Sequence, residues 1–168
     1  MTLSDHGSNH GTEHHPDHTH HLQGDEPLVL LLHGPNLNLL GEREPEVYGT
    51  ATLIDYAKAA VRSAAEHGLR IESHQSNHEG ELIDLIHAAR GRCAAIIINP
   101  GAFTHYAWAI HDALAAFEGP IVEVHISNPN AREPWRHTSV IAPVATGSIT
   151  GFGIDGYDLA IRAVAGRL

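Results

Sequence analysis

Apolar residues along this chain follow two periods, and segments of the two kinds alternate. Five short segments, nearly all apolar or alternating with polar residues, have the length of β-strands, namely 28–32, 69–73, 94–98, 120–124 and 147–151. In four longer segments apolar residues recur every three or four positions, as on one face of an α-helix, namely 52–68, 76–91, 104–117 and 156–165. The stretch 128–139 is polar and contains proline, so we expect at most one helical turn there.

Capping residues support the starts of two of these helices. Thr52 and Asp55 are spaced like the pair of a capping box, and Ser76 and Glu79 repeat that spacing at the start of the next helix. Gly68 is placed to stop the first of the two, because glycine adopts the left-handed conformation that ends many helices.

The alternation of strand and helix from Pro27 onward predicts a parallel sheet with helices on both faces. Five strands in one small domain favour the flavodoxin-like order 2-1-3-4-5, a doubly wound α/β fold in three layers, α/β/α. We therefore expect a single domain over residues 27–168, without internal repeats. Ligands of such sheets bind beyond the carboxyl ends of the strands, where the strand order reverses between the first and third strands.

Residues 1–26 differ in composition from the rest of the chain. They contain seven of the 16 histidines, no Lys or Arg, and almost no large apolar side chains. Such a segment cannot bury enough surface to offset the entropy lost on ordering, so we predict a disordered, histidine-rich tail. Histidine-rich tracts bind nickel or zinc adventitiously, but the irregular spacing here specifies no tetrahedral metal site.

Composition narrows the functional class. The chain has 20 Asp and Glu against 10 Lys and Arg, which argues against a protein that holds nucleic acid by its phosphates. No apolar stretch approaches the roughly 20 residues that span a bilayer, and the first residues do not resemble a signal peptide. The single cysteine, Cys93, cannot form an intramolecular disulfide, which fits a reducing compartment. We expect a soluble cytoplasmic protein.

A long connection, residues 34–49, follows the first predicted strand. Connections of this length inside a compact domain are often binding loops or lids. It contains Arg43 and Tyr48, and a permanent cation beside a phenol would favour the phenolate form, which is a base. The plainer interpretation is a surface arginine and a packed tyrosine, and the loop taken alone favours it.

Polar and titratable residues follow the first, third and fourth predicted strands, at the edge where ligands are expected. They are Asn36, Arg43 and Tyr48, then Asn99 and His105, then His125, Arg132 and Arg136. Residues 34–40 lack the Ser and Thr of a flavin-phosphate loop and the G-x-G-x-x-G spacing of a dinucleotide site. No acidic residue directly follows the first or third strand, as a phospho-acceptor domain would require. The residues present suit a small anionic or polyhydroxylated substrate.

Five motifs in this chain resemble, in the same order, those of the type II 3-dehydroquinate dehydratases. They read H-G-P-N-L-N-x-L-G-x-R-E-P-x-x-Y-G from His33, Q-S-N-H-E-G from Gln75, N-P-G-A-F-T-H from Asn99, E-V-H-I-S-N-P-N-A-R-E-x-x-R-H from Glu123, and A-T-G-x-I-x-G-F-G-x-x-G-Y from Ala145. The resemblance covers Leu28 to about Val164. It implies a flavodoxin-like fold and the removal of water from 3-dehydroquinate to give 3-dehydroshikimate, in the shikimate pathway or sometimes in quinate breakdown.

The same resemblance implies catalytic roles for four residues. Tyr48 would take a proton from C2, next to the ketone, and Arg43 would hold Tyr48 as phenolate. Asn36 would position a water against the enolate oxygen, as in an oxyanion hole. His125 would protonate the departing C1 hydroxyl as general acid. No metal or organic cofactor is implied.

Further residues would bind the substrate or support the site. The resemblance implies that Asn99 and the backbone of Ile126 and Ser127 meet the substrate carboxylate, and that His105 and Arg136 bind the ring hydroxyls. Glu123 would help orient the site, and Arg132 is expected to support the lid. It also implies a role for Asp112 in a site.

Two competing interpretations can be tested against the residues of this chain. A lysine Schiff base is the other route to this dehydration, but Lys58, the single lysine, lies on a predicted helix far from the strand ends. A non-catalytic module of the same fold could bind an anionic metabolite. Such a binder does not require the set Arg43, Tyr48 and His125.

The position of Asp112 predicts an oligomer. His105 and Asp112 lie seven residues apart on the predicted third helix, which rises about 10.5 Å over that span. A single-ring substrate held by His105 can hardly reach so far. We therefore expect Asp112 to serve the site of a neighbouring subunit, as in the trimers of the family, four of which form a dodecamer.

Overall fold

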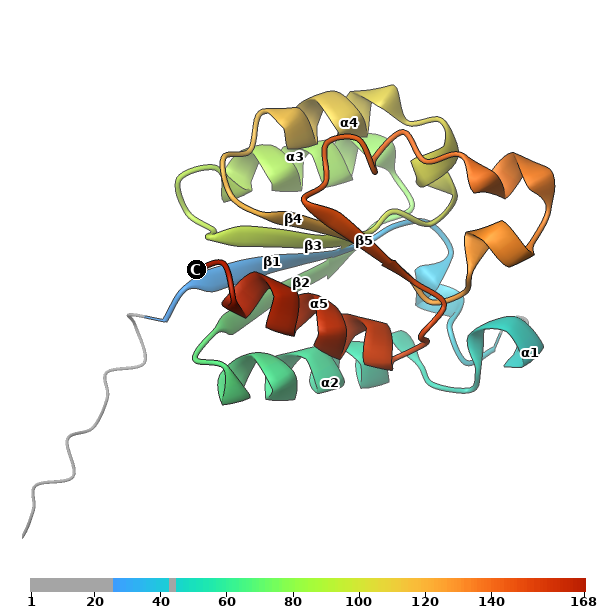
Figure 1. Cartoon of the computed structure of the whole chain (residues 1–168), viewed down its shortest axis with the longest axis horizontal. Coiled ribbons are helices and arrows are strands. Elements are labelled where there is room, and N and C mark those ends of the chain that lie inside the picture. The colour runs from blue at the N-terminus through green and yellow to red at the C-terminus, as the bar shows by residue number, and fades with distance from the viewer. Residues whose placement is uncertain (1–25, 43–44) are drawn as a thin grey trace, which may run out of the picture.

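The computed structural model describes residues 26–42 and 45–168 and contains one five-stranded parallel sheet, ordered β2-β1-β3-β4-β5. The strands are β1 (Leu28–His33), β2 (Arg70–Gln75), β3 (Ala95–Asn99), β4 (Ile121–His125) and β5 (Gly147–Thr150). Helices α2 (Leu53–Glu66) and α5 (Asp155–Ala165) cover one face, and α3 (Glu79–Ala89) and α4 (Trp108–Ala115) cover the other (Figure 1). The predicted fold class and strand order are confirmed.

The predicted tail, residues 1–26, lies outside the described residues except for Glu26, and its disorder stays a prediction. Among the residues that are described, no helix is long and apolar enough to cross a membrane.

The central strands are buried on both faces, which explains their continuous apolar sequence. Leu31 and Ile97 point into the core between the sheet and helices α2 and α5. Their chain neighbours Leu30 and Ile98 point into the core on the side of α3 and α4. Because successive side chains of a strand alternate between faces, a strand with cores on both sides has no polar face.

One of the two predicted helix caps is confirmed. Thr52 accepts a hydrogen bond from the Asp55 backbone N–H at 3.3 Å, and the Asp55 carboxylate accepts one from the Thr52 N–H at 2.9 Å. The prediction for Ser76 is wrong, because α3 begins after His78, which makes no side-chain cap. Ser76 instead accepts from the N–H of His78, at 2.9 Å, and donates to Glu81. The serine therefore closes a turn before the helix.

The predicted third helix, 104–117, is wrong as one continuous element. The chain forms a 3-10 turn at Gly101–His105, and α4 begins only at Trp108. Between them Tyr106 has φ −155°, far from a helical value, so the helical hydrogen bonds cannot continue through it. His105 and Asp112 therefore do not share one helix face, although Asp112 does lie on α4.

Both polar connections at the strand ends contain more helical structure than their sequences predict. The long connection after β1 contains a 3-10 turn, Leu37–Leu39, and the short helix α1 (Pro45–Tyr48). The connection after β4 contains two 3-10 turns, Pro129–Ala131 and Pro134–His137, each begun by proline, whose fixed φ suits the first helical position.

His33, at the carboxyl end of β1, is a polar residue enclosed in this fold. Its side chain is 0% exposed and stacks on Tyr157 of α5, with ring centroids 5.6 Å apart. Burial disfavours the charged form and lowers the pKa of His33 from 6.5 to about 4. Folding therefore opposes protonation of this residue, which makes stability depend on pH.

We predict that stability falls as the pH drops from about 6.5 to 4. In that window the unfolded chain binds a proton at His33 and the folded chain does not, so unfolding becomes easier by up to about 1.4 kcal/mol per pH unit. The lowered pKa values of Glu123 and Glu72 act at lower pH, below their usual 4.5. Urea unfolding of the native chain and of His33→Asn, at pH 4.5 and 7, measures the effect. The substitution should flatten the pH dependence, and an unchanged dependence would contradict the assignment.

Candidate active site

A cavity of about 260 Å³ opens at the carboxyl ends of β1, β3 and β4, the edge that the fold predicts for ligands. Its lining includes nine of the predicted site residues, namely Asn36, Tyr48, Asn99, His105, His125, Ile126, Ser127, Arg132 and Arg136. They come from the last residues of β3 and β4 and from three connections that are remote in sequence. The parallel sheet brings them together because neighbouring strands end at the same edge.

The loop after β1 is held against the loop after β3 by a close backbone approach. The N–H of Gly34 donates to the carbonyl oxygen of Asn99 at 2.7 Å. A Cβ at position 34 would lie 2.3 Å from the carbonyl oxygen of Pro100, so only glycine fits there. The start of the first loop is thereby fixed at the cavity.

Asn36 has a φ of 67°, a backbone conformation that residues other than glycine rarely adopt. Its N–H donates to Oδ1 of Asn77 at 2.9 Å. Gln75 donates to the same oxygen at 3.0 Å and to the carbonyl oxygen of Gly34 at 3.2 Å. The loop after β2 therefore stabilises the strained turn that places Asn36 at the cavity.

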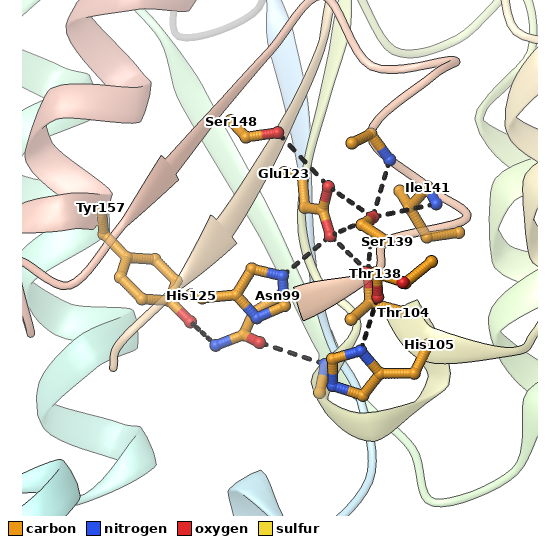
Figure 2. Close-up of polar contacts among 12 residues, drawn as sticks. Asn99, Thr104, His105, Glu123, His125, Thr138, Ser139, Ile141, Ser148 and Tyr157 are labelled. Carbon is orange, nitrogen blue, oxygen red and sulfur yellow. Dashed lines mark hydrogen bonds and ion pairs between the residues drawn. The ribbon is translucent and has the colours of Figure 1, made fainter. Parts of the chain in front are cut away.

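His125 is oriented by Glu123 on the same strand. The imidazole Nε2 lies 2.8 Å from the carboxylate, and the two side chains are 11% and 1% exposed. Figure 2 shows the ring between this carboxylate and the region of Asn99. A carboxylate only accepts hydrogen bonds, so Nε2 carries a hydrogen and Nδ1 remains for the cavity that the ring lines.

Glu123 is a buried carboxylate surrounded by donors. Thr104 and Ser139 donate to it, the latter at 3.0 Å, and Ser148 lies 3.3 Å away (Figure 2). Burial alone would raise the pKa of Glu123, but the hydrogen bond and charge of His125, together with the hydroxyls of Thr104 and Ser139, lower it below its usual 4.5. The group is therefore ionised at neutral pH.

Tyr48 pairs with a cation, Arg132. Nη1 of Arg132 donates to the phenol oxygen at 2.7 Å, and the guanidinium carbon lies 5.5 Å from the ring centroid. The sequence identified the phenol but assigned it a different partner, Arg43, which lies outside the described residues. Nothing in the spacing of Tyr48 and Arg132, 84 residues apart, indicated their contact.

His105 and Arg136 lie around an aromatic ring that the sequence analysis missed. Nδ1 of His105 donates to the carbonyl oxygen of Thr138 at 2.7 Å. In the neutral imidazole, Nε2 then carries no hydrogen and is an acceptor. Trp135 packs edge-on against His105 at 5.2 Å, and the guanidinium of Arg136 lies 4.0 Å from the Trp135 centroid. The sequence feature that could have indicated this contact is a lone tryptophan in a polar connection that contains proline.

The hydroxyls around Glu123 were also missed, because no local pattern links Ser139 or Ser148 to a residue on β4. Asp112 is exposed on α4 and does not line the cavity. Lys58 is exposed on α2 and also lies outside the lining.

Known proteins with similar sequences and structures are numerous. The family model described as dehydroquinase class II matches residues 27–165. A 3-dehydroquinate dehydratase 2 of Pseudomonas putida is 58% identical over 140 residues, which are 83% of this chain and 94% of the relative. A catabolic 3-dehydroquinase of Emericella nidulans is 52% identical over 140 residues, 83% of this chain and 92% of the relative.

Solved structures of two type II dehydroquinases have a similar fold. The type II dehydroquinase of Propionibacterium acnes superposes with a TM-score of 0.81 at 43% identity, covering 84% of this chain and 97% of that one. That of Butyrivibrio crossotus gives 0.82 at 43% identity, covering 84% and 99%. Sequence, fold and the place of the cavity lead to one conclusion: this chain belongs to the class II dehydroquinase family.

Proposed function

We infer that this chain is a hydro-lyase that removes water from 3-dehydroquinate to give 3-dehydroshikimate. The family match and the relatives named 3-dehydroquinate dehydratase support this activity. The observation that carries it is one cavity lined by both a cation-paired phenol, Tyr48, and a carboxylate-paired imidazole, His125. A base and an acid facing the same small space are what an elimination requires.

In the proposed first step, the Tyr48 oxygen takes the proton from C2, and the electrons of the C–H bond move into an enolate. Arg132 offers the phenolate a charge-assisted hydrogen bond. Arg43 would add a second cation; this role stays a prediction, since Arg43 is outside the described residues. Asn36, held at the cavity by Asn77, would position a water against the enolate oxygen.

In the second step, the enolate re-forms the ketone and a C1–C2 double bond while the C1–O bond breaks. His125 donates the proton that turns the leaving hydroxyl into water. With Nε2 held by Glu123, the proton comes from Nδ1 of the imidazolium. Tyr48 finishes with the C2 proton and His125 has lost one, so exchange with solvent restores both.

The substrate carboxylate would meet the Asn99 amide and the backbone N–H groups of Ile126 and Ser127, residues that all line the cavity. His105 and Arg136, positioned by Trp135, would bind the ring hydroxyls. These groups need no metal or organic cofactor to perform the two steps.

We place this reaction in the shikimate pathway and in the cytoplasm. A role in quinate breakdown is the alternative within the family, and one relative bears the name catabolic 3-dehydroquinase. A non-catalytic metabolite binder of the same fold is the alternative outside it. The paired Tyr48 and His125 favour an enzyme, because a passive binder gains nothing from an acid and a base.

We further propose that the chain forms trimers, four of which assemble into a homododecamer, and that Asp112 completes the site of a neighbour. Asp112 is exposed on α4 and outside its own chain's cavity. Tyr106 and Trp108, close by in the chain, are each 60% exposed, which is unusual for large aromatic side chains and typical of a surface that another subunit covers.

Tyr48→Phe should lower kcat by at least about 10²-fold, because it removes the proposed base and leaves the ring packing intact. The rate is followed by the near-ultraviolet absorbance of the conjugated enone product. Tyr56→Phe, which removes a phenol hydroxyl outside the cavity lining, is the matched control. Turnover by Tyr48→Phe close to that of the unaltered chain would show that Tyr48 is not the base.

Activity should survive borohydride in the presence of substrate. A Schiff-base mechanism would require Lys58, the single lysine, which is exposed on α2 and does not line the cavity. Mass spectrometry of the treated chain provides the measurement. Inactivation together with substrate mass added at Lys58 would refute the phenolate mechanism.

Mixed oligomers test the shared site. Tyr48→Phe and Asp112→Ala should each be impaired alone, and co-expression should partly restore activity. Some sites would then combine an intact Tyr48 with an intact Asp112 from the neighbour. Mixed oligomers are verified by two different affinity tags. If they form and activity does not return, Asp112 does not act in a neighbour's site.

A further inference from the structure

Three buried polar side chains are linked in series by polar contacts, and one of them, Asn99, lines the cavity. Asn99 ends β3, His33 ends the adjacent β1, and the two are paired in the register of the sheet. Tyr157 of α5 lies between their side chains: Nδ2 of Asn99 donates to its phenol oxygen at 3.1 Å, and that oxygen lies 3.3 Å from Nδ1 of His33. Asn99 and Tyr157 are visible together in Figure 2. All three side chains are at most 3% exposed.

One backbone N–H group sets the orientation of the Asn99 amide, and with it the donor and acceptor roles in this series of contacts. The N–H of Gly101 can only donate, and it points at the Asn99 side-chain oxygen at 3.1 Å. The other end of that amide is therefore the NH₂ group, which donates to Tyr157. Since the phenol oxygen accepts from Asn99, its own hydrogen is available for Nδ1 of His33.

This arrangement requires a neutral His33 with its hydrogen on Nε2. Burial favours the neutral form, since it lowers the pKa of His33 to about 4. Nε2 is buried and has no hydrogen-bond partner among the described residues. Nδ1 of a neutral His33 is then an acceptor for the Tyr157 hydroxyl hydrogen.

We propose that His33 is a positioning residue: by accepting the Tyr157 hydroxyl hydrogen, it keeps the Asn99 amide turned so that N–H, and not C=O, is presented to an anionic group in the cavity. Among the described residues, the other side chain in hydrogen-bond contact with that hydroxyl is Asn99, whose amide also carries an acceptor. Without an acceptor at position 33, the amide would then be driven to turn its oxygen toward Tyr157, against the N–H of Gly101. This inference rests on the proposed contact of Asn99 with the substrate carboxylate.

The test compares His33→Leu, which has no acceptor, with His33→Asn, whose Oδ1 can take the place of Nδ1. His33→Leu should raise the KM for 3-dehydroquinate about tenfold, as expected when one hydrogen bond to a charged group is lost, with a smaller change in kcat. His33→Asn should recover most of the lost affinity. A purely structural role would lower thermal stability in His33→Leu without this KM change and without rescue by Asn.

Tyr157→Phe provides a second readout that keeps the ring in place. Alone it should leave KM nearly unchanged, because the hydroxyl that would compete for the Asn99 oxygen is gone and the Gly101 N–H still holds the amide. Added to His33→Leu, it should restore most of the lost affinity for the same reason. A double variant with a KM as high as that of His33→Leu would overturn the proposal.

Asn99→Ala separates this inference from the function on which it rests. If Asn99→Ala leaves KM unchanged, the proposed carboxylate contact is wrong. If Asn99→Ala raises KM while folded His33→Leu does not, that contact stands and the positioning role of His33 is refuted. An His33→Asn variant as weak in substrate binding as His33→Leu would also overturn it.

Discussion

The site depends above all on a carboxylate that the fold buries. Glu123 is 1% exposed on β4, and an ion so placed is tolerated only when its hydrogen-bonding capacity is filled. The donors come from different parts of the chain: Thr104 after β3, Ser139 in the connection after β4, and Ser148 on β5. The remaining donor is His125. Satisfying one buried charge therefore joins three segments and fixes the imidazole at the cavity.

The loop after β1 is held at the cavity by uncharged groups. The backbone of the loop after β1 meets the loop after β3 through Gly34, and Asn77 stabilises the left-handed turn at Asn36. Behind Asn99, the amide orientation is determined by the Gly101 N–H and by Tyr157. In both cases a backbone N–H, which can only donate, fixes the orientation of a neighbouring side-chain amide.

Periodicity was enough to predict the sheet, its order and the edge where the cavity opens, because apolar runs and helix faces report burial directly. Local patterns predicted the starts of two helices wrongly. Ser76 has the spacing of a cap but bonds Glu81 instead, and the helix predicted from Thr104 is broken at Tyr106. Contacts between distant segments, such as Arg132 with Tyr48, leave no periodic signal in a single sequence.

The central claim is that a buried carboxylate holds His125 as the acid of a dehydration. The most direct measurement is the rise in near-ultraviolet absorbance when 3-dehydroquinate is added to the purified chain, to Glu123→Gln, and to Glu118→Gln as an exposed control. We predict a rapid rise with the unaltered chain and the control, and a rise roughly 10²-fold slower with Glu123→Gln, the lower end of what a general acid contributes. No rise with the unaltered chain, or equal rates for Glu123→Gln and the unaltered chain, would contradict this account.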